Sequence, residues 1–395
     1  MIKIMQQLPK SFWFLVVIAL AVKAGLYIFI AVTNPDSILE FDSYEYLSRA
    51  SVLAGGFRGD DISHAYNIFR TPGYPFFLMV FHHWLRVPLI GVIGIQLVLN
   101  ILAAWVTAKS AERLDPELIP VSALIILLDF PTTVFSLMIL TEAVFLLLMS
   151  ILLYSGVRYL QDHRMRWVLI ASLTLTAAVY MRPAAYYLPL MTGGLMAADA
   201  VLRHRGSRLK LLMHAFLLLF IAYGLVFCWQ LRNYKTTGQF KFSSIDQATL
   251  NTYGLIGRYA RGDISNKIDA ESMHPVVYYI YTTSRHVVDL MGEPGSLKYF
   301  DCAAIRSAGK VFGYLTILFW LPGFLAGIFR MGRQVHFWFM LAMVAYFVAV
   351  TILAVGWETT PRFRVPMMPF IAVMSAYGWI WIAPRLKSKN ENIRS

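Results

Sequence analysis

The sequence contains a series of apolar runs that are each about as long as a membrane is thick. A helix needs roughly 20 mainly apolar residues to cross the hydrocarbon core of a bilayer. Apolar residues make up 58% of the chain and charged residues only 14%, whereas soluble proteins contain roughly 25% charged residues. The runs therefore predict an all-α polytopic membrane protein and exclude a soluble enzyme. They lie at residues 11–33, 89–108, 118–135, 137–157, 167–181, 184–202, 209–229, 308–329, 335–355 and 365–384.

Two long segments between these runs are too polar to cross a membrane, residues 34–71 and 230–307. We expect them to fold outside the bilayer, with short amphipathic helices, as parts of a single membrane domain that covers residues 1–395. The first apolar run lacks a small-residue cleavage site and is followed by further runs, so it is expected to remain as the first of about 10–11 transmembrane helices.

The distribution of Lys and Arg predicts the orientation, because short loops rich in these residues stay in the cytoplasm. The loops at 158–166, 203–210 and 330–333 and the C-terminal tail are basic, whereas segment 34–71 has six acidic and three basic residues. We therefore expect an inner (plasma) membrane protein with both termini in the cytoplasm. The outer face then carries three segments: the acidic segment 34–71, segment 230–307 and segment 356–364. The net charge of +13 follows from these loops, so no nucleic-acid partner is expected.

A shorter run at 73–88 is broken by prolines and contains His82, His83 and Arg86. Four apolar runs lie between the outer segment 34–71 and the cytoplasmic loop at 158–166, where an odd number of crossings is required. The sequence thus favours a segment 73–88 that enters the membrane and returns without crossing it, which leaves ten crossings.

The acidic outer segment contains two carboxylates three residues apart, Asp42 and Glu45, with Tyr46 beside them. On a short helix the two carboxylates share a face. A carboxylate that is partly desolvated at the membrane surface can accept a proton from a sugar or lipid hydroxyl. The alternative is a solvated acidic loop without a chemical role.

Three arginines lie where polar segments meet apolar runs, and each could hold a phosphate group. Arg70 precedes a turn made rigid by two prolines and a glycine, near Tyr74, whereas Arg362 and Arg364 flank an aromatic residue. The planar guanidinium matches phosphate geometry. The alternatives are a snorkelling arginine at the start of a helix for Arg70, and two charges on an outer loop for the other pair.

Four further ionisable residues lie inside or at the ends of apolar runs, where a charge is costly without a partner or water. Glu142 and Arg182 fall at the outer ends of their runs and could pair or line an outward cavity. For Lys23 the sequence favours a structural ion pair with Glu142 or Asp129.

Taken in chain order, these motifs resemble the integral-membrane glycosyltransferases of the C superfamily. The likeness is to the bacterial group related to the protein O-mannosyltransferases and the aminoarabinose transferase of lipid A (glycosyltransferase family 39), and it extends over residues 11–384. The motifs are Asp42 with Tyr46, Arg70-Thr71-Pro72-Gly73-Tyr74-Pro75, Thr141-Glu142, Arg182-Pro183, Arg232-Asn233 with Gly238, and Arg362-Phe363-Arg364-Val365-Pro366 with Pro369.

The resemblance implies an inverting transferase that moves a sugar from a polyprenyl phosphate donor onto a glycan, lipid or protein acceptor at the outer membrane face. It implies that Asp42 is the catalytic base. The resemblance further implies that Arg70, Arg362 and Arg364 bind the donor phosphate, and that Glu142 and Arg182 shape the cavity. Supporting roles would fall to Glu45, Tyr46, Tyr74, Arg232 and Asn233.

The loop 230–307 is the expected acceptor-binding part, since its tyrosines could stack on sugar faces; alternatively they form its packed core and membrane-interface belt. These are Tyr253, Tyr259, Tyr278, Tyr279, Tyr281 and Tyr299. Histidine spacing supports no dedicated metal site, which leaves no certain cofactor and a divalent cation open. Two other functions compete: a flippase or transporter of lipid-linked sugars without transferase activity, and a structural subunit of an envelope complex.

Overall fold

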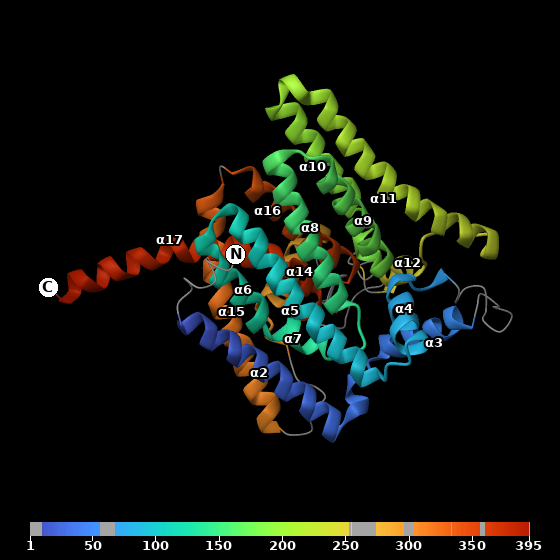
Figure 1. The fold of residues 1–395 in the computed structure, drawn as a ribbon, viewed down its shortest axis with the longest axis horizontal. Helices are drawn as coiled ribbons and strands as arrows, with labels where there is room; N and C mark the ends of the chain where they lie inside the picture. The colour runs from blue at the N-terminus through green and yellow to red at the C-terminus, as the bar shows by residue number, and fades with distance from the viewer. Residues whose placement is uncertain are drawn as a thin grey trace.

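The structure is a computed structural model that describes residues 10–55, 68–252, 254, 274–295, 303–332, 334–355 and 360–394. In these residues the chain forms helices and no strands, as the sequence predicts (Figure 1). The protein is thus an all-α polytopic membrane protein.

Seven of the described helices are long and apolar enough to cross a membrane, counting η8 and the start of α17 as one. They are α2 (Lys10–Thr33), α5 (Leu89–Leu114), α8 (Glu142–Asp162), α11 (Arg208–Thr237), α15 (Ala303–Met331), α16 (Val335–Ala354) and η8 (Pro361–Met367) with α17 (Met368–Arg394).

The ten predicted runs are all helical, but three of them are not single full-length spans. The run 118–135 is two helices, α6 (Ile119–Leu128) and α7 (Phe130–Ser136), and α9 (Met165–Met181) and α10 (Leu188–Arg203) have only 17 and 16 residues. By length and composition the described residues therefore supply seven spans, or eight with the bent pair, against the ten to eleven expected.

The bend between α6 and α7 has a local cause at Asp129 and Pro131. The two helices meet at 51°. Pro131 cannot continue α6, because it has no backbone N–H to donate and its ring clashes with the preceding turn of the helix. The Asp129 carboxylate instead caps the new helix by accepting the backbone N–H of Thr132 at 3.0 Å.

Segment 73–88 folds as two short helices, α4 (Gly73–Leu78) and the π-helical η3 (Met79–Trp84), of six residues each. Together they fall short of the roughly 20 residues that a crossing needs. This agrees with the expectation that this segment does not cross the membrane.

The described parts of the polar segments contain short helices, as predicted. The first holds η1 (Pro35–Ile38) and α3 (Phe41–Ala54), which buries Ser43, Tyr46 and Ala50 on one face. The second holds α12 (Ile245–Thr252) and α14 (Pro275–Gly292). Tyr253, Tyr259 and Tyr299 of the predicted acceptor loop lie outside the described residues.

Helices α15 and α17 approach closely through glycines on both. A Cβ added at Gly378 would lie 1.9 Å from the carbonyl oxygen of Gly323, and one at Gly327 would lie 2.1 Å from that of Met374. Small residues spaced four apart, as Gly323 and Gly327 are, allow membrane helices to pack backbone to backbone.

We expect Gly378→Ala to destabilise the protein by about 1–3 kcal/mol, since the added methyl group must separate the two helices. Gly224→Ala is the matched control, because a Cβ on that α11 residue meets nothing within 4 Å and alanine is the better helix former. Thermal unfolding in detergent measures both. Equal midpoints for the two variants would show that the α15–α17 contact tolerates a methyl group.

Candidate active site

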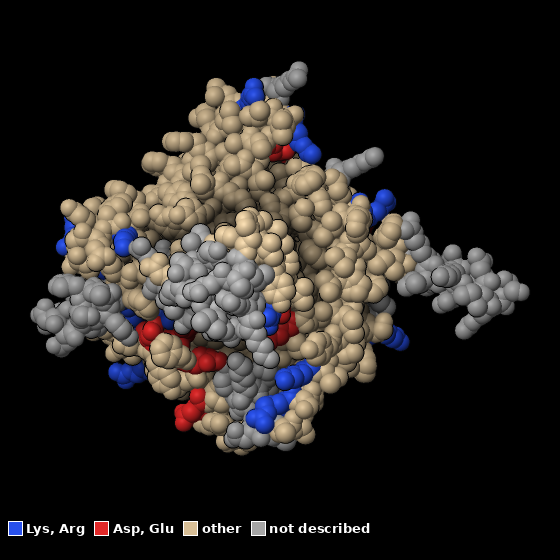
Figure 2. Space-filling model, turned by 180° about the vertical axis from the view of Figure 1, so that it is seen from behind, with Lys and Arg blue, Asp and Glu red and all other residues tan. Residues whose placement is uncertain are grey.

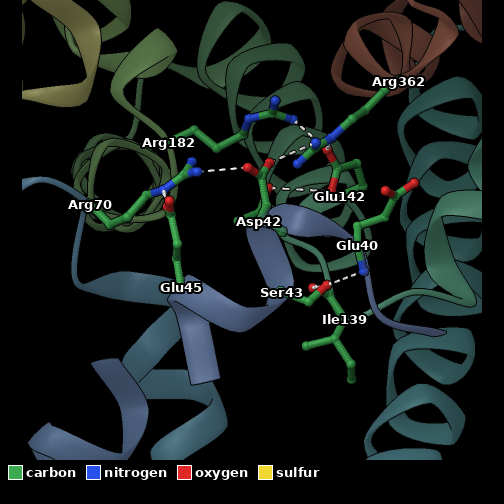
Figure 3. A network of polar contacts seen from close by, with 10 residues as sticks. Glu40, Asp42, Ser43, Glu45, Arg70, Ile139, Glu142, Arg182 and Arg362 are labelled. Atoms are coloured by element: carbon green, nitrogen blue, oxygen red, sulfur yellow. Dashed lines mark hydrogen bonds and ion pairs between the residues drawn. The ribbon is translucent and has the colours of Figure 1, made fainter. Parts of the chain in front are cut away.

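The start of α3 is fixed against the segment that leads into α8 by one serine. Ser43 Oγ accepts the backbone N–H of Glu40 at 2.9 Å and donates to the carbonyl of Ile139 at 2.9 Å. A second bond joins the N–H of Ile139 to the carbonyl of Ile38. This double anchor brings the first turn of α3 beside the first turn of α8 (Figure 3).

Asp42 projects from that turn between two arginines that come from distant parts of the chain. Arg70 Nη2 lies 2.6 Å from Asp42 Oδ1, and Arg362 Nη1 lies 2.8 Å from Oδ2. Each carboxylate oxygen thus has its own guanidinium partner, as Figure 3 shows. Arg70 also binds Glu45 through Nε.

Glu142 forms the second anionic centre and is completely buried. Its Oε1 accepts a hydrogen bond from Arg182 Nη1 at 3.0 Å and another from Arg362 Nε. Arg362 therefore bridges the two carboxylates of Asp42 and Glu142. The pairing of Glu142 with Arg182 was one of the expectations from the sequence, and the structure confirms it.

These six side chains form the acid–arginine cluster: Asp42, Glu45, Arg70, Glu142, Arg182 and Arg362. Its three carboxylates and three guanidiniums balance to zero net charge. Asp42 keeps 22% of its side-chain surface exposed and Arg362 keeps 19%, so both remain accessible to a ligand. On the face of the molecule drawn in Figure 2, acidic and basic side chains gather mainly in the lower half.

The ionisation of Asp42 reflects its neighbours. Burial on its own would raise the pKa of this carboxyl group, but the guanidiniums of Arg362 and Arg70 hold the pKa below its ordinary value. Asp42 is therefore ionised at neutral pH while both arginines remain in place.

Aromatic rings position Arg70. The Arg70 guanidinium lies 5.2 Å from the centre of the Tyr46 ring, which packs edge to face on Tyr74 at 5.0 Å. Tyr74 is fully buried, and its hydroxyl donates to Gln96 Oε1 at 2.6 Å. Rings thus limit the movement of Arg70 without taking up its hydrogen-bond donors.

Arg364 is one of the predicted phosphate ligands, but the structure places it outside the acid–arginine cluster. Its side chain is fully buried and donates through Nη1 to three carbonyls near the end of α14, those of Leu290 (2.8 Å), Met291 (2.9 Å) and Glu293 (3.2 Å). Its Nη2 also lies 4.0 Å from the carboxylate of Asp129. In this position Arg364 joins α14 to η8.

Arg232 and Asn233, predicted to have supporting roles, make local contacts at the end of α11. Arg232 Nη1 donates to Asn233 Oδ1 at 3.0 Å, and the Asn233 amide donates to the carbonyls of Lys241 and Phe242. These bonds hold the chain where it turns after the left-handed Gly238.

The expected ion pair of Lys23 is wrong. Its Nζ donates to the hydroxyl of Thr133 at 2.5 Å, and neither Glu142 nor Asp129 is within ion-pair distance of it among the described residues. The partner is the neutral hydroxyl of Thr133, so pairing Lys23 with acidic residues in the sequence could not identify it. Ser43 and Gln96 were missed for the same reason, since both act through backbone or neutral partners.

Two groups of residues bear on metal binding. In the acid–arginine cluster each carboxylate already has a guanidinium partner, a donor set that suits an anion better than a cation. Elsewhere, His163, Asp199 and His204 bring three ligand atoms within 4.8 Å of one another. Sequence spacing did not predict this group, because His163 lies 36 residues before Asp199.

The sequence matches no protein-family profile and no curated protein sequence. The fold does match solved structures. An oligosaccharyltransferase AglB from Archaeoglobus fulgidus, in complex with an inhibitory peptide and a dolichol-phosphate, superposes with a TM-score of 0.53 and 12% identity over 97% of this chain and 52% of the archaeal one.

Other structures of the Archaeoglobus fulgidus oligosaccharyltransferase match similarly. One tethered to an acceptor peptide with an NVT sequon gives a TM-score of 0.54 at 12% identity, over 95% of this chain and 50% of that one. A complex with Zn and sulfate gives 0.51 at 14% identity, over 93% and 49%. The chain thus spans about half the length of the oligosaccharyltransferases it matches, and it shares the fold of the part that it covers.

Proposed function

We propose that the protein is an inverting glycosyltransferase that uses a polyprenyl-phosphate-linked sugar and that the acid–arginine cluster is its active site. The observation that carries this proposal is the position of Asp42, an accessible carboxylate held between Arg70 and Arg362. A base beside two phosphate-binding groups is the minimum that such a transfer requires.

The arginines are suited to the leaving group. As the bond between the sugar and the phosphate breaks, negative charge grows on the phosphate oxygen that departs. Guanidiniums already fixed in place stabilise this charge without reorganising. Arg362 and Arg70 are the ligands proposed for the phosphate, and Arg182 holds Glu142, which in turn orients Arg362.

Binding of the donor would also change Asp42. A phosphate that takes hydrogen bonds from Arg362 or Arg70 competes with the carboxylate for the same N–H groups. Asp42 then loses the contacts that lower its pKa, while its burial, which raises the pKa, remains. Donor binding would thereby turn Asp42 from a carboxylate paired with two arginines into a stronger base.

The proposed reaction balances without another reactant. The acceptor hydroxyl oxygen attacks the anomeric carbon from the face opposite the phosphate, and the configuration inverts. Asp42 takes the hydroxyl proton, the new C–O bond forms, and the polyprenyl phosphate departs with the electron pair of the broken bond.

The acceptor is proposed to bind near α14 in the second polar segment. Of its predicted tyrosines that the structure describes, Tyr278 is buried, Tyr279 is half-buried and Tyr281 is 48% exposed. Tyr281 is therefore a better candidate for stacking on a sugar ring, and Tyr278 belongs to the packed interior. The proposed acceptor is a glycan, a lipid or a protein.

The proposed location is the plasma membrane, with both termini in the cytoplasm and the cluster on the outer face. Segment 34–71 was assigned to the outer side from its charge, and the outer positions of Glu142, Arg182 and segment 356–364 follow from the predicted order of the crossings. The ion pairs that join them support placing them together on one side of the membrane domain.

The test is transfer of labelled sugar from a panel of polyprenyl phosphate donors by the purified protein in liposomes, together with release of the polyprenyl phosphate. We expect Arg362→Lys to lower the rate about 10²-fold, because lysine cannot bridge Asp42 and Glu142 or stabilise the leaving phosphate in two directions. Arg166→Lys on α9, half exposed in an ordinary i,i+4 pair with Asp162, is the matched control.

Transfer by the wild type with loss in Arg362→Lys alone would support the proposal. Movement of the donor across the liposome bilayer without transfer to any acceptor would instead support the flippase alternative. Equal rates in both variants would remove Arg362 from the reaction.

A further inference from the structure

A second group of polar side chains lies at the far end of α8 from the acid–arginine cluster. Helix α8 begins at Glu142 and ends at Asp162, a length of about 30 Å at 1.5 Å per residue. His163 follows directly, and Asp199 and His204 lie at the end of α10. These three residues, the His–Asp–His group, take no part in the proposed transfer.

The distances within the group suit ligands of one ion better than hydrogen bonds. Asp199 Oδ2 lies 3.5 Å from His163 Nε2 and 3.4 Å from His204 Nε2. A hydrogen bond between N–H and O usually spans about 2.7–3.2 Å. Two ligand atoms about 2.1 Å from a tetrahedral zinc ion are about 3.4 Å apart, which matches these two distances. All three ligand atoms lie within 4.8 Å of one another.

The backbone at His163 is a second, independent observation. This residue ends α8 in the left-handed conformation with φ +48°, where glycine is the usual residue because it has no Cβ. His163 side-chain atoms are 21% exposed and turn toward Asp199, not into solvent alone. An imidazole at a position that favours glycine is explained if its ring nitrogen is required to bind a ligand.

The surroundings hold Asp199 in place beside the two imidazole rings, which pack edge to face with their centres 4.5 Å apart. Arg203 approaches the other oxygen of Asp199, with Nε 3.8 Å from Oδ1. Asp199 is only 8% exposed, so its carboxylate is held in place. A cavity of about 350 Å³ lies beside it, lined by Asp199, Arg203, Tyr159 and mainly apolar residues of α8, α9, α10 and α16.

We propose that His163, Asp199 and His204 bind a divalent transition-metal ion, with zinc the best match. Imidazole nitrogen and carboxylate oxygen are ligands zinc takes in tetrahedral sites, and three protein ligands leave one position for water or another ligand. The ion would fasten the α8–α9 turn to the end of α10. This site stands independently of the proposed glycosyl transfer.

The experiment is metal titration of the purified full-length protein in detergent after removal of metals with a chelator. We expect one Zn²⁺ to bind per chain and to raise the thermal unfolding midpoint, and Co²⁺ at the same site to show the visible absorption bands of tetrahedral coordination. His163→Asn and His204→Asn should each weaken Zn²⁺ binding by at least about tenfold. Asparagine also tolerates the left-handed conformation, so the first variant keeps the turn.

His83→Asn is the matched control, a histidine on η3 outside the group, and it should bind Zn²⁺ like the wild type. Asp199→Asn supplies an independent third variant if either histidine variant fails to fold. The proposal is overturned if the wild type binds no Zn²⁺ at one per chain, or if all variants bind it equally. In that case the three side chains only contact one another directly.

Discussion

Replacing Asp42 by asparagine is expected to lower kcat for sugar transfer by about 10²–10⁴-fold, the usual contribution of a general base. Asparagine has nearly the same shape but cannot take up the acceptor proton. It also competes less for the N–H groups of Arg70 and Arg362, which each bind one Asp42 oxygen in the protein as it stands. We therefore expect KM for the donor to stay the same or to fall.

The combination of a lower kcat with an unchanged or lower KM separates a base from a structural residue. Asp36→Asn is the matched control, since Asp36 is an exposed acid of the same outer segment, on η1. Both variants are compared by single-turnover transfer in liposomes after their folding is checked. Full activity of the Asp42 variant would contradict the assignment and direct attention to Glu45 and Glu142.

Replacing Arg364 by methionine is expected to lower the free energy of unfolding by about 3–5 kcal/mol, the range found when one partner of a buried charged contact is removed. The change leaves the carbonyls of Leu290, Met291 and Glu293 without their donor. It also removes the guanidinium stacked 5.3 Å from the ring centre of Trp320. The folded fraction should bind donor with an unchanged KM, because Arg364 lies outside the acid–arginine cluster.

The unfolding midpoint in detergent and the donor KM are measured on the same preparation. Arg306→Met is the control, an arginine on the surface of α15 whose loss should have little effect on either quantity. A stable Arg364 variant with a raised donor KM would reverse this conclusion and restore the sequence-based expectation that Arg364 binds the phosphate.

Arg362 and Arg364 show where sequence reasoning reaches its limit. Both flank Phe363 at the start of the last span, and nothing in their spacing separates them. The segment folds as the 3₁₀ helix η8, which has three residues per turn. Residues two apart then point about 120° apart, so Arg362 faces Asp42 and Glu142 while Arg364 faces the end of α14.

The same limit applies to the His–Asp–His group. The sequence shows only isolated histidines, because no local spacing links the end of α8 to the end of α10. Their meeting depends on how α8, α9 and α10 pack. The bend at Asp129 is different, because its cause is local: Pro131 cannot continue α6, although the run 118–135 was expected to be one span.

The sequence by itself determined the helical membrane class, and it predicted the sides on which the polar segments fall and the concentration of Asp42, Arg70, Glu142, Arg182 and Arg362 near one side. Those features depend on apolar length and loop charge, which are local properties of a chain in a bilayer. Only the tertiary structure decided which charges meet, because ion pairing depends on the rotation of each helix about its axis and on contacts between segments up to 320 residues apart.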